Sequence, residues 1–190
     1  MKTVFFLISI LSLSAQAQER IVHDHPHHHH QGQASHDKHV MTFDSDGMVM
    51  HENYNQLPDD CSTIEKDVYL EVRAGRQHAR TGFAWGFDKH QWNVPPCSRI
   101  NVTLINEDSV RHQWMVHGLP KYLYPQGMFH LEAGGKTKRS GIFIVPSDNA
   151  TYLAHCDIAQ HMEKGLKAQL VVGRGAGNLS SVPGITSSRR

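Results

Sequence analysis

The chain has 190 residues, which is enough for one domain with a hydrophobic core plus extensions. Its formal net charge is +1 at pH 7, so it lacks the basic field that nucleic-acid binding requires, and we expect no nucleic-acid partner. Histidine is the compositional outlier, with 16 residues. Half of them fall within residues 23–39, which directs attention to metal chemistry.

The first 17 residues have the pattern of a secretory signal peptide. Lys2 precedes an apolar stretch over residues 4–13, and small residues follow it up to Ala17. The apolar stretch is too short to span a bilayer and no other stretch comes close, so no membrane span is expected. We expect cleavage after Ala17 and export to an oxidising compartment; an uncleaved N-terminal anchor is the alternative.

A histidine-rich segment with almost no apolar residues follows, and we expect it to be disordered when metal-free. It suits a low-specificity chelator of copper, zinc or nickel, with an expression tag as the alternative. The methionines that come next offer thioethers, which select Cu(I), although they would serve equally well in packing. The candidate accessory copper ligands are His23, His25, His27, His28, His29, His30, His36, His39, Met41, Met48, Met50 and His51.

From residue 68 onward, short alternating runs broken by Gly, Pro and Asn predict an all-β sandwich. The expected strands cover residues 68–74, 84–87, 99–106, 111–117, 141–145, 151–156 and 167–172. Residues 118–138, with several prolines and glycines, are expected to form one long connection. The predicted organisation is a signal peptide (1–17), a His/Met-rich metal-binding extension (18–60), a β domain (61–173) and a flexible tail (174–190).

Three cysteines need explanation in an oxidising compartment. Cys61 and Cys97 both lie in turn-like settings, and a disulfide between them would attach the segment before the first strand to the sheet. Cys156 is then the odd thiol, which makes it the candidate for metal binding.

Side-chain alternation places candidate metal ligands on one inner face. In the strand over residues 111–117, His112 shares the core face with Trp114, and Cys156 points inward from its own strand. A lone inward histidine is more often a hydrogen-bonded core residue, but His161 follows Cys156 by five residues and completes a set of three. A thiolate with two neutral imidazoles suits copper and favours electron transfer.

The pattern His112…Cys156-x4-His161-x4-Leu166 resembles the type 1 copper site of cupredoxins, over about residues 68–172. Together with the His-rich front, the chain is most similar to the periplasmic copper-tolerance cupredoxins of the CopI type. This resemblance implies a Greek-key β-sandwich, type 1 copper, a periplasmic location and a role in copper resistance.

The axial position departs from the family pattern. Cupredoxins usually have Met where this chain has Leu166, which cannot coordinate. The site would then be three-coordinate or would use a backbone oxygen, for instance that of Arg111, and Met162 is the rival axial candidate. Loss of a thioether donor should favour Cu(I) and give a more oxidising centre.

A second copper site is implied by the histidine strand and the His155-Cys156 dipeptide, which are similar to those of multicopper oxidases and copper nitrite reductases. That similarity assigns His117 and His155 as ligands on the opposite face, with Met115 beside them and His155-Cys156 as the electron path. Met115 stands where nitrite reductases have an acid, which argues against nitrite chemistry and suits Cu(I). Two surface histidines without metal are the alternative. His130 is either a further ligand or a loop residue, and the sequence does not decide between them.

The sequence therefore predicts a periplasmic copper-tolerance protein that binds several coppers and oxidises Cu(I) to Cu(II) by electron transfer to the type 1 site. Whether it turns over as a cuprous oxidase is left open. A copper chaperone or sequestration protein and a simple periplasmic electron carrier are the alternatives. The electron acceptor and the oligomeric state do not follow from the sequence.

Overall fold

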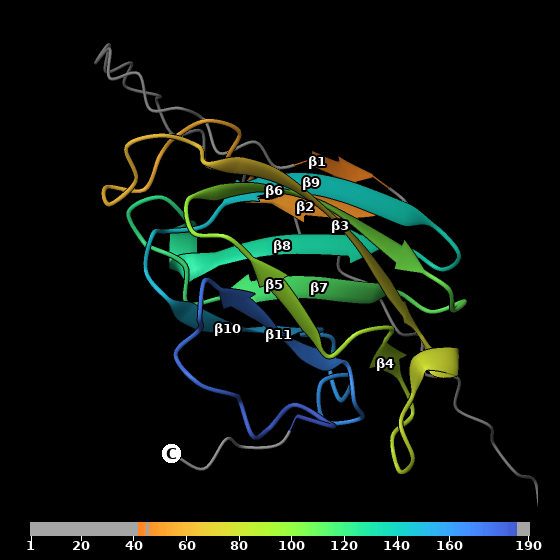
Figure 1. Ribbon diagram of the computed structural model, residues 1–190. Coiled ribbons are helices and arrows are strands. Elements are labelled where there is room, and N and C mark those ends of the chain that lie inside the picture. Colours follow the sequence, from red (N-terminus) through yellow and green to blue (C-terminus); the bar gives the residue numbers. More distant parts are fainter. Residues whose placement is uncertain (1–41, 45, 186–190) are drawn as a thin grey trace, which may run out of the picture. The chain divides into compact units, whose positions relative to one another are not determined.

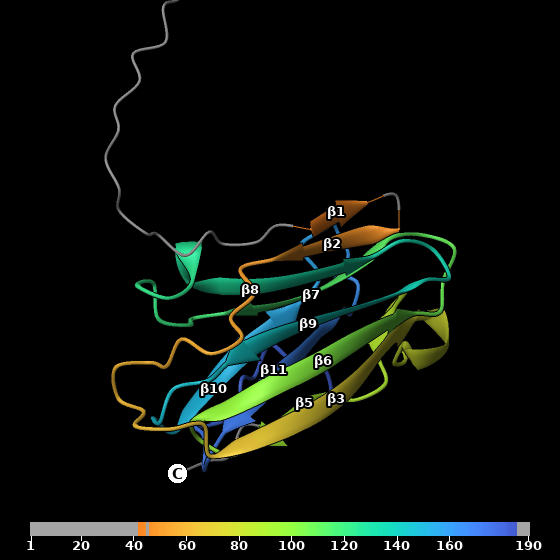
Figure 2. The same cartoon turned by 90° about the horizontal axis from the view of Figure 1, so that it is seen from above.

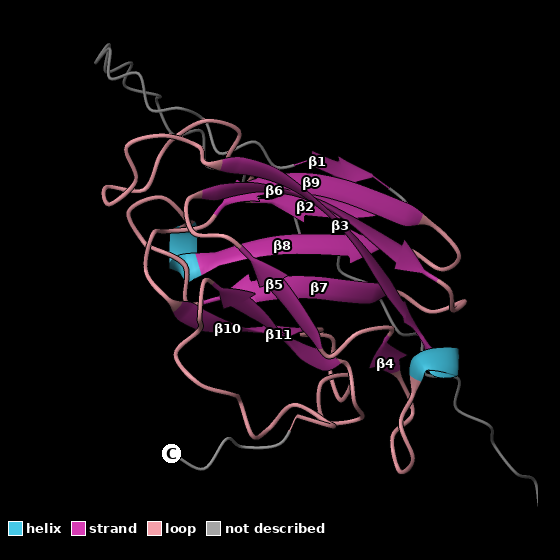
Figure 3. Ribbon diagram, in the orientation of Figure 1, coloured by secondary structure: helices cyan, strands magenta, loops and turns pink. Residues whose placement is uncertain are grey.

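Two β-sheets enclose one hydrophobic core (Figures 1 and 2). This computed structural model describes residues 42–44 and 46–185. The strand order is β1-β2-β8-β7-β10-β11-β5 in the larger sheet, sheet A below, and β4-β3-β6-β9 in the smaller one, sheet B. Figure 3 shows that strands and loops dominate, with two short helical turns. The predicted all-β sandwich is confirmed.

Sheet A consists of β1 (Thr42–Asp44), β2 (Gly47–Met50), β5 (Gln91–Val94), β7 (His112–His117), β8 (Met128–Ala133), β10 (Ala150–His155) and β11 (Lys167–Val172). Sheet B consists of β3 (Lys66–Gly75), β4 (Gly86–Phe87), β6 (Ser98–Asn106) and β9 (Lys138–Ile144). The 3-10 turns are η1 (Arg76–His78) and η2 (Pro125–Gly127). Within the described chain, β11–β5 and β3–β6 pair in parallel and the remaining pairs are antiparallel. No helix in this part of the chain is long and apolar enough to cross a membrane.

The core forms because strands with alternating polarity bury one side each. Along β6, buried residues alternate strictly with partly exposed ones. Aromatic rings join the two sheets: Phe129 of β8 stacks on Phe143 of β9 with ring centroids 4.6 Å apart. Trp114 of β7 meets Trp92 of β5 edge-on at 5.7 Å. These contacts fix β7, the strand that carries His112, at the centre of the molecule.

The expected single connection over residues 118–138 is wrong, because it contains β8. Prolines and glycines lie on both sides of a six-residue run in which Phe129, Leu131 and Ala133 are fully buried. That run pairs with β7 on one side and β2 on the other. The short strand β5 was also not predicted, since only four residues of it alternate.

Part of the predicted extension belongs to sheet A, and part of the predicted tail packs against the domain. Residues 47–50 form β2 and pair with β8, so the sandwich begins before residue 61. Near the other end, Leu179 N donates to Gln169 Oε1 at 2.9 Å, and Val182 is buried. The candidate ligands within residues 23–39, and Met41, lie outside the described residues.

The predicted disulfide between Cys61 and Cys97 is confirmed, with Cα atoms 5.7 Å apart. It joins the segment before β3 to the residue that precedes β6. Cys156 is the free cysteine, and it is buried.

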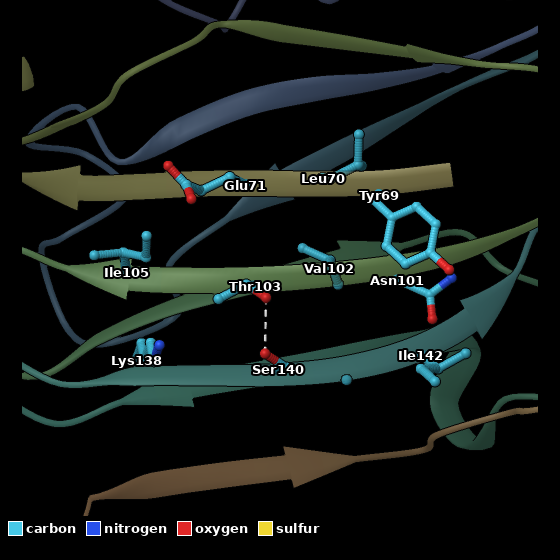
Figure 4. Close-up of a pocket in the computed structure, with 11 residues that line it drawn as sticks. Tyr69, Leu70, Glu71, Asn101, Val102, Thr103, Ile105, Lys138, Ser140 and Ile142 are labelled. Atoms are coloured by element: carbon cyan, nitrogen blue, oxygen red, sulfur yellow. Dashed lines mark hydrogen bonds between the residues drawn. The ribbon is translucent and has the colours of Figure 1, made fainter. Parts of the chain in front are cut away.

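A hollow of about 550 Å³ lies over β3, β6 and β9 on the outer face of sheet B (Figure 4). Tyr69 stands at its rim with 78% of its surface exposed, and the hydroxyls of Thr103 and Ser140 hydrogen-bond across it at 2.7 Å. No His, Cys or Met side chain lines this hollow. The candidate metal ligands lie instead on sheet A and in the loop after β10.

We expect Tyr124→Phe to lower the free energy of unfolding by about 1–3 kcal/mol, because it leaves buried polar groups without a hydrogen-bond partner. The Tyr124 hydroxyl donates to Ile144 O at 2.8 Å and accepts from Ile144 N at 2.8 Å and Asn53 Nδ2 at 3.1 Å. Urea denaturation measures the loss. Tyr122→Phe is the control: its hydroxyl accepts from Asp59 N at the exposed surface, so the change should stay below about 0.5 kcal/mol. Equal losses would contradict the assignment.

Burial raises the pKa of Tyr124 from 10.0 to about 12. The neutral phenol therefore contributes stability that is complete below pH 10 and declines as the pH rises towards 12. The Tyr124→Phe variant should show a weaker decline over this alkaline range, measured by urea denaturation at each pH. An identical pH dependence would show that ionisation of Tyr124 does not cause the loss of stability at alkaline pH.

Candidate metal centre

Three side chains predicted as ligands converge at one end of the sandwich. His112 begins β7, Cys156 follows β10, and His161 lies in the loop that leads to β11. Their ligand atoms all lie within 4.8 Å of one another and all three residues are buried. His161 Nδ1 is 3.2 Å from His112 Nδ1 and 3.5 Å from Cys156 Sγ. Among the described residues, no other group of three or more His, Cys, Asp or Glu side chains meets this criterion.

The loop from Cys156 to Leu166 is closed by its own backbone. Cys156 N donates to Leu166 O at 3.0 Å, and Leu166 N donates to His161 O at 3.0 Å. Gly165 has φ +114°, and a Cβ there would lie 2.4 Å from the carbonyl oxygen of Trp85, so only glycine fits. Leu166 is thereby tied to two candidate ligands through its main chain.

Leu166, the residue at the axial position of the family pattern, is an apolar residue of the core. The Leu166 side chain is fully buried in the same core cluster as Cys156. Met162 is partly buried, and its carbonyl accepts a bond from Gly165 N at 3.1 Å. That copper here is three-coordinate or uses a backbone oxygen such as that of Arg111, with Met162 as the rival ligand, stays a prediction.

Asp108 orients the ring of His112. Its Oδ2 lies 2.8 Å from His112 Nε2, while its Oδ1 accepts from Arg76 N at 3.1 Å. Asp108 N in turn donates to the Oδ1 of buried Asn106 at 3.0 Å. Because the Asp108 carboxylate accepts a hydrogen bond from Nε2–H, Nδ1 of the neutral His112 ring presents its lone pair to the cluster. Burial works against ionisation of Asp108, but the bonds from His112 and Arg76 hold its pKa below the ordinary value.

Burial keeps the cluster uncharged. It raises the pKa of the Cys156 thiol to about 11, and it lowers the pKa of His112 and of His161. Gln113 N points at Cys156 Sγ at 3.4 Å. A metal ion that binds here would displace the thiol proton and find two neutral imidazoles. A soft sulfur with two imidazole nitrogens is the donor set that copper prefers, so these residues fit a copper ion.

Trp85 covers the His161 side of the cluster. Its ring lies 4.2 Å from the ring of His161, centroid to centroid, and Trp85 N donates to Lys164 O at 3.1 Å. Lys164 Nζ and the Arg76 guanidinium lie over the indole at 5.9 and 5.7 Å. The sequence did not indicate Trp85 or Asp108, because neither stands at a diagnostic spacing from a candidate ligand.

The second predicted group lies on the opposite face of sheet A. The rings of His117 and His155 stack with centroids 4.8 Å apart and an interplanar angle of 18°. β10 pairs with β7 so that His155 lies opposite Met115 and Leu153 opposite His117. The prediction that these side chains meet on one face therefore agrees with the register.

This second face is largely buried, unlike the two surface histidines that were the alternative. Met115 and His155 are only 4% and 7% exposed. His117 Nε2 and His155 Nδ1 are buried without a hydrogen-bond partner. Burial also lowers the pKa of His117. His130 is a strand residue of β8, directly opposite Met115, and not a loop residue.

Three of the predicted accessory ligands lie in or beside β2. Met48 and Met50 alternate with buried Gly47 and Val49, so both methionines share the outer face as predicted. His51 Nδ1 lies 2.9 Å from Met128 O. The structure therefore brings a pair of thioethers to the outer side of sheet A.

No protein-family model and no curated protein matches the chain. Solved structures with a similar arrangement include auracyanin A, a "blue" copper protein from Chloroflexus aurantiacus, with 20% identity and a TM-score of 0.44 over 56% of this chain and 99% of that one. Auracyanin from Roseiflexus castenholzii has 20% identity and a TM-score of 0.41, over 55% and 96%. A multi-copper oxidase from Pediococcus acidilactici has 21% identity and a TM-score of 0.43, over 64% of this chain and 29% of that one.

Removing the carboxylate of Asp108 should weaken copper binding. We expect Asp108→Ala to lower Cu(II) affinity about 10–100-fold, since mutating a residue that hydrogen-bonds to a ligand histidine typically weakens metal binding by this factor. Competition with a Cu(II) chelator, followed by the thiolate-to-copper charge-transfer band, measures the affinity. The control is Asp67→Ala, which removes a surface ion pair with Arg99 and should leave the affinity unchanged. An unchanged affinity in Asp108→Ala would contradict the orienting role.

Leu166→Met should lower the reduction potential of bound copper, because an axial thioether stabilises Cu(II) relative to an open position. The swap conserves volume, so it should cost less than about 1.5 kcal/mol of stability. Redox titration measures the potential. Met162→Leu is the matched control and should leave it unchanged. If the control raises the potential instead, Met162 is the axial ligand.

Proposed function

We propose that the chain is an exported copper-binding electron-transfer protein of the cupredoxin type that acts in copper tolerance. The observation that supports this most directly is the opposite placement of two consecutive residues. Cys156 belongs to the buried cluster with His112 and His161, whereas the ring of His155 stacks on His117. A copper ion held by the buried cluster would supply one-electron redox chemistry.

The protein residues prepare the buried cluster for that chemistry. The closed loop and the Asp108 bond fix the three donors before a metal binds, and preformed ligands need little rearrangement between redox states. Apolar surroundings and the hydrocarbon of Leu166 favour the lower charge of Cu(I). The cluster is therefore suited to accept an electron.

The substrate that we propose for the second face is Cu(I). Met115 provides a thioether, and His117 and His155 provide two imidazole nitrogens without hydrogen-bond partners, which together form a soft donor set. Oxidation of one Cu(I) to Cu(II) there gives up one electron. The His155–Cys156 backbone is the covalent path for that electron to the buried cluster. Repeated turnover then needs an external one-electron acceptor protein in the same compartment.

Copper sequestration is the second candidate function, favoured by the thioethers of Met48 and Met50 on the outer face. In that case the outer residues would hold Cu(I) without passing on an electron. A simple electron carrier is the third candidate, and it leaves these outer ligands without a role.

Anaerobic addition of Cu(I) to protein loaded with Cu(II) in the buried cluster should bleach the thiolate-to-copper charge-transfer band. For each equivalent of buried Cu(II) that is reduced, one equivalent of a new Cu(II) signal should appear. Cys156→Ser should abolish the band altogether. An unchanged band after Cu(I) addition would favour sequestration and contradict Cu(I) oxidation.

His117→Ala should leave the intensity of the band unchanged but slow its bleaching by at least about tenfold, since it removes one of the ligands that hold Cu(I) near the electron path. Stopped-flow absorbance measures the rate. His90→Ala is the control, because His90 lies in the loop before β5 and accepts from Arg80 Nε at 2.6 Å, away from the stacked pair. Equal rates in wild type and His117→Ala would remove the second face from the mechanism.

A further inference from the structure

The outer face of sheet A carries a row of four metal-capable side chains that crosses four strands. His155 of β10 lies opposite Met115 of β7, and Met115 lies opposite His130 of β8. His130 in turn lies opposite Met50 of β2. Imidazole and thioether therefore alternate along the row, which continues beyond the stacked pair of His117 and His155.

The four side chains share one face because residues directly opposite on antiparallel strands project to the same side, with Cβ atoms about 4.5–5.5 Å apart. The neighbouring row confirms the direction. Val49, Leu131 and Trp114 are opposite one another in β2, β8 and β7, and they belong to the hydrophobic core with exposures of 3%, 0% and 0%. The row from Met50 to His155 must then project away from the core.

Two imidazoles of the row are buried with a nitrogen that has no partner. His130 is 5% exposed and its Nε2 makes no hydrogen bond. His155 is 7% exposed and its Nδ1 makes none either. A buried polar nitrogen left without a partner is destabilising. The thioethers beside them are weak acceptors and donate nothing. A cation that accepts lone pairs would satisfy the free nitrogen of His130 together with the thioethers that lie opposite it on the two neighbouring strands.

The row differs from the row next to it on the same face. Met48 lies opposite Glu132, and the Glu132 carboxylate is already engaged by Arg111 and by Gln113 Nε2. Met48 therefore lies opposite a carboxylate that already has two partners, whereas Met50 lies opposite His130, whose Nε2 has no hydrogen-bond partner. This contrast makes Met48 a matched control for Met50.

We propose that His130, Met50 and Met115 form a capture site for a soft monovalent cation, Cu(I), beside the His117–His155 pair, with Met115 shared between the two. One imidazole with two thioethers selects Cu(I) over Zn(II) or Cu(II). The onward passage of the ion to His117 and His155 rests on the proposed function, but its binding by Met50 and His130 does not.

Silver(I) tests the site, since it is a soft monovalent ion that cannot be oxidised here. The full chain, with its buried cluster holding reduced copper, is titrated with Ag⁺ while the seven methionine methyl groups are followed by ¹³C NMR. We expect the methyls of Met50 and Met115 to shift together, at Ag⁺ concentrations that leave those of Met48 and Met162 in place.

Two variants test the ligand assignment. His130→Gln should raise the Ag⁺ concentration for half-shift of Met50 at least tenfold. Because His130 is buried, Met50→Leu provides a second variant that conserves volume at a partly exposed position, and it should weaken the Ag⁺ response of Met115 by a similar factor. Met48→Leu should change neither response.

The outcomes separate this site from the proposed function. If Met115 shifts while Met50 does not, or if Met48→Leu weakens binding as much as Met50→Leu, the capture site is overturned, while Cu(I) oxidation at His117 and His155 can still stand. If Met50 and Met115 shift together but Cu(I) fails to bleach the charge-transfer band, the capture site is supported and the proposed oxidation is contradicted.

Discussion

The register of β7 against β10 determines which side chains meet on each face of sheet A. Ala154 lies opposite Val116 on the core side, and His155 lies opposite Met115 on the outer side. Cys156, the next residue, then returns to the core side beside His112. A slip of one residue would turn the thiol outward and bring His155 into the core. The aromatic contacts of Trp114 with Trp92 and Phe143 hold β7 against such a slip.

The two faces offer different chemistry because they differ in donors rather than in burial. Both are largely desolvated, with His112 at 0% and His155 at 7% exposure. The core side has a thiol and two imidazoles with fixed orientation, which suits a permanently bound copper. The outer side has imidazoles and thioethers spread over several strands, which suits a copper ion that arrives and leaves. One backbone linkage, between His155 and Cys156, joins the two.

Local patterns in the sequence were sufficient for the buried cluster. Alternation along residues 112–117 gave the direction of His112, the five-residue spacing placed His161 near Cys156, and the remaining two cysteines form the predicted disulfide. These inferences succeeded because each depends on neighbours along the chain, including the turn-like settings from which Cys61 and Cys97 were paired.

The outer row could not be predicted because it depends on pairings between segments that are far apart in the sequence. Nothing local to Met50 indicates that it pairs with His130, and β8 itself is short and flanked by prolines and glycines that favour a loop. The burial of His155 and Met115 likewise could not be predicted, because alternation along their strands assigns both side chains only to the face away from the core. The role of Asp108 arises from a turn that Asn106 holds through side-chain bonds.

In the proposed function, β7 and β10 together hold two copper ions on opposite faces. Anomalous scattering at the copper edge, from crystals of the full chain grown with an excess of copper, would locate both ions. We expect one peak between His112, Cys156 and His161, and a second on the outer face beside His117 and His155. A single peak at the buried cluster, with no copper on the outer face of sheet A, would contradict it.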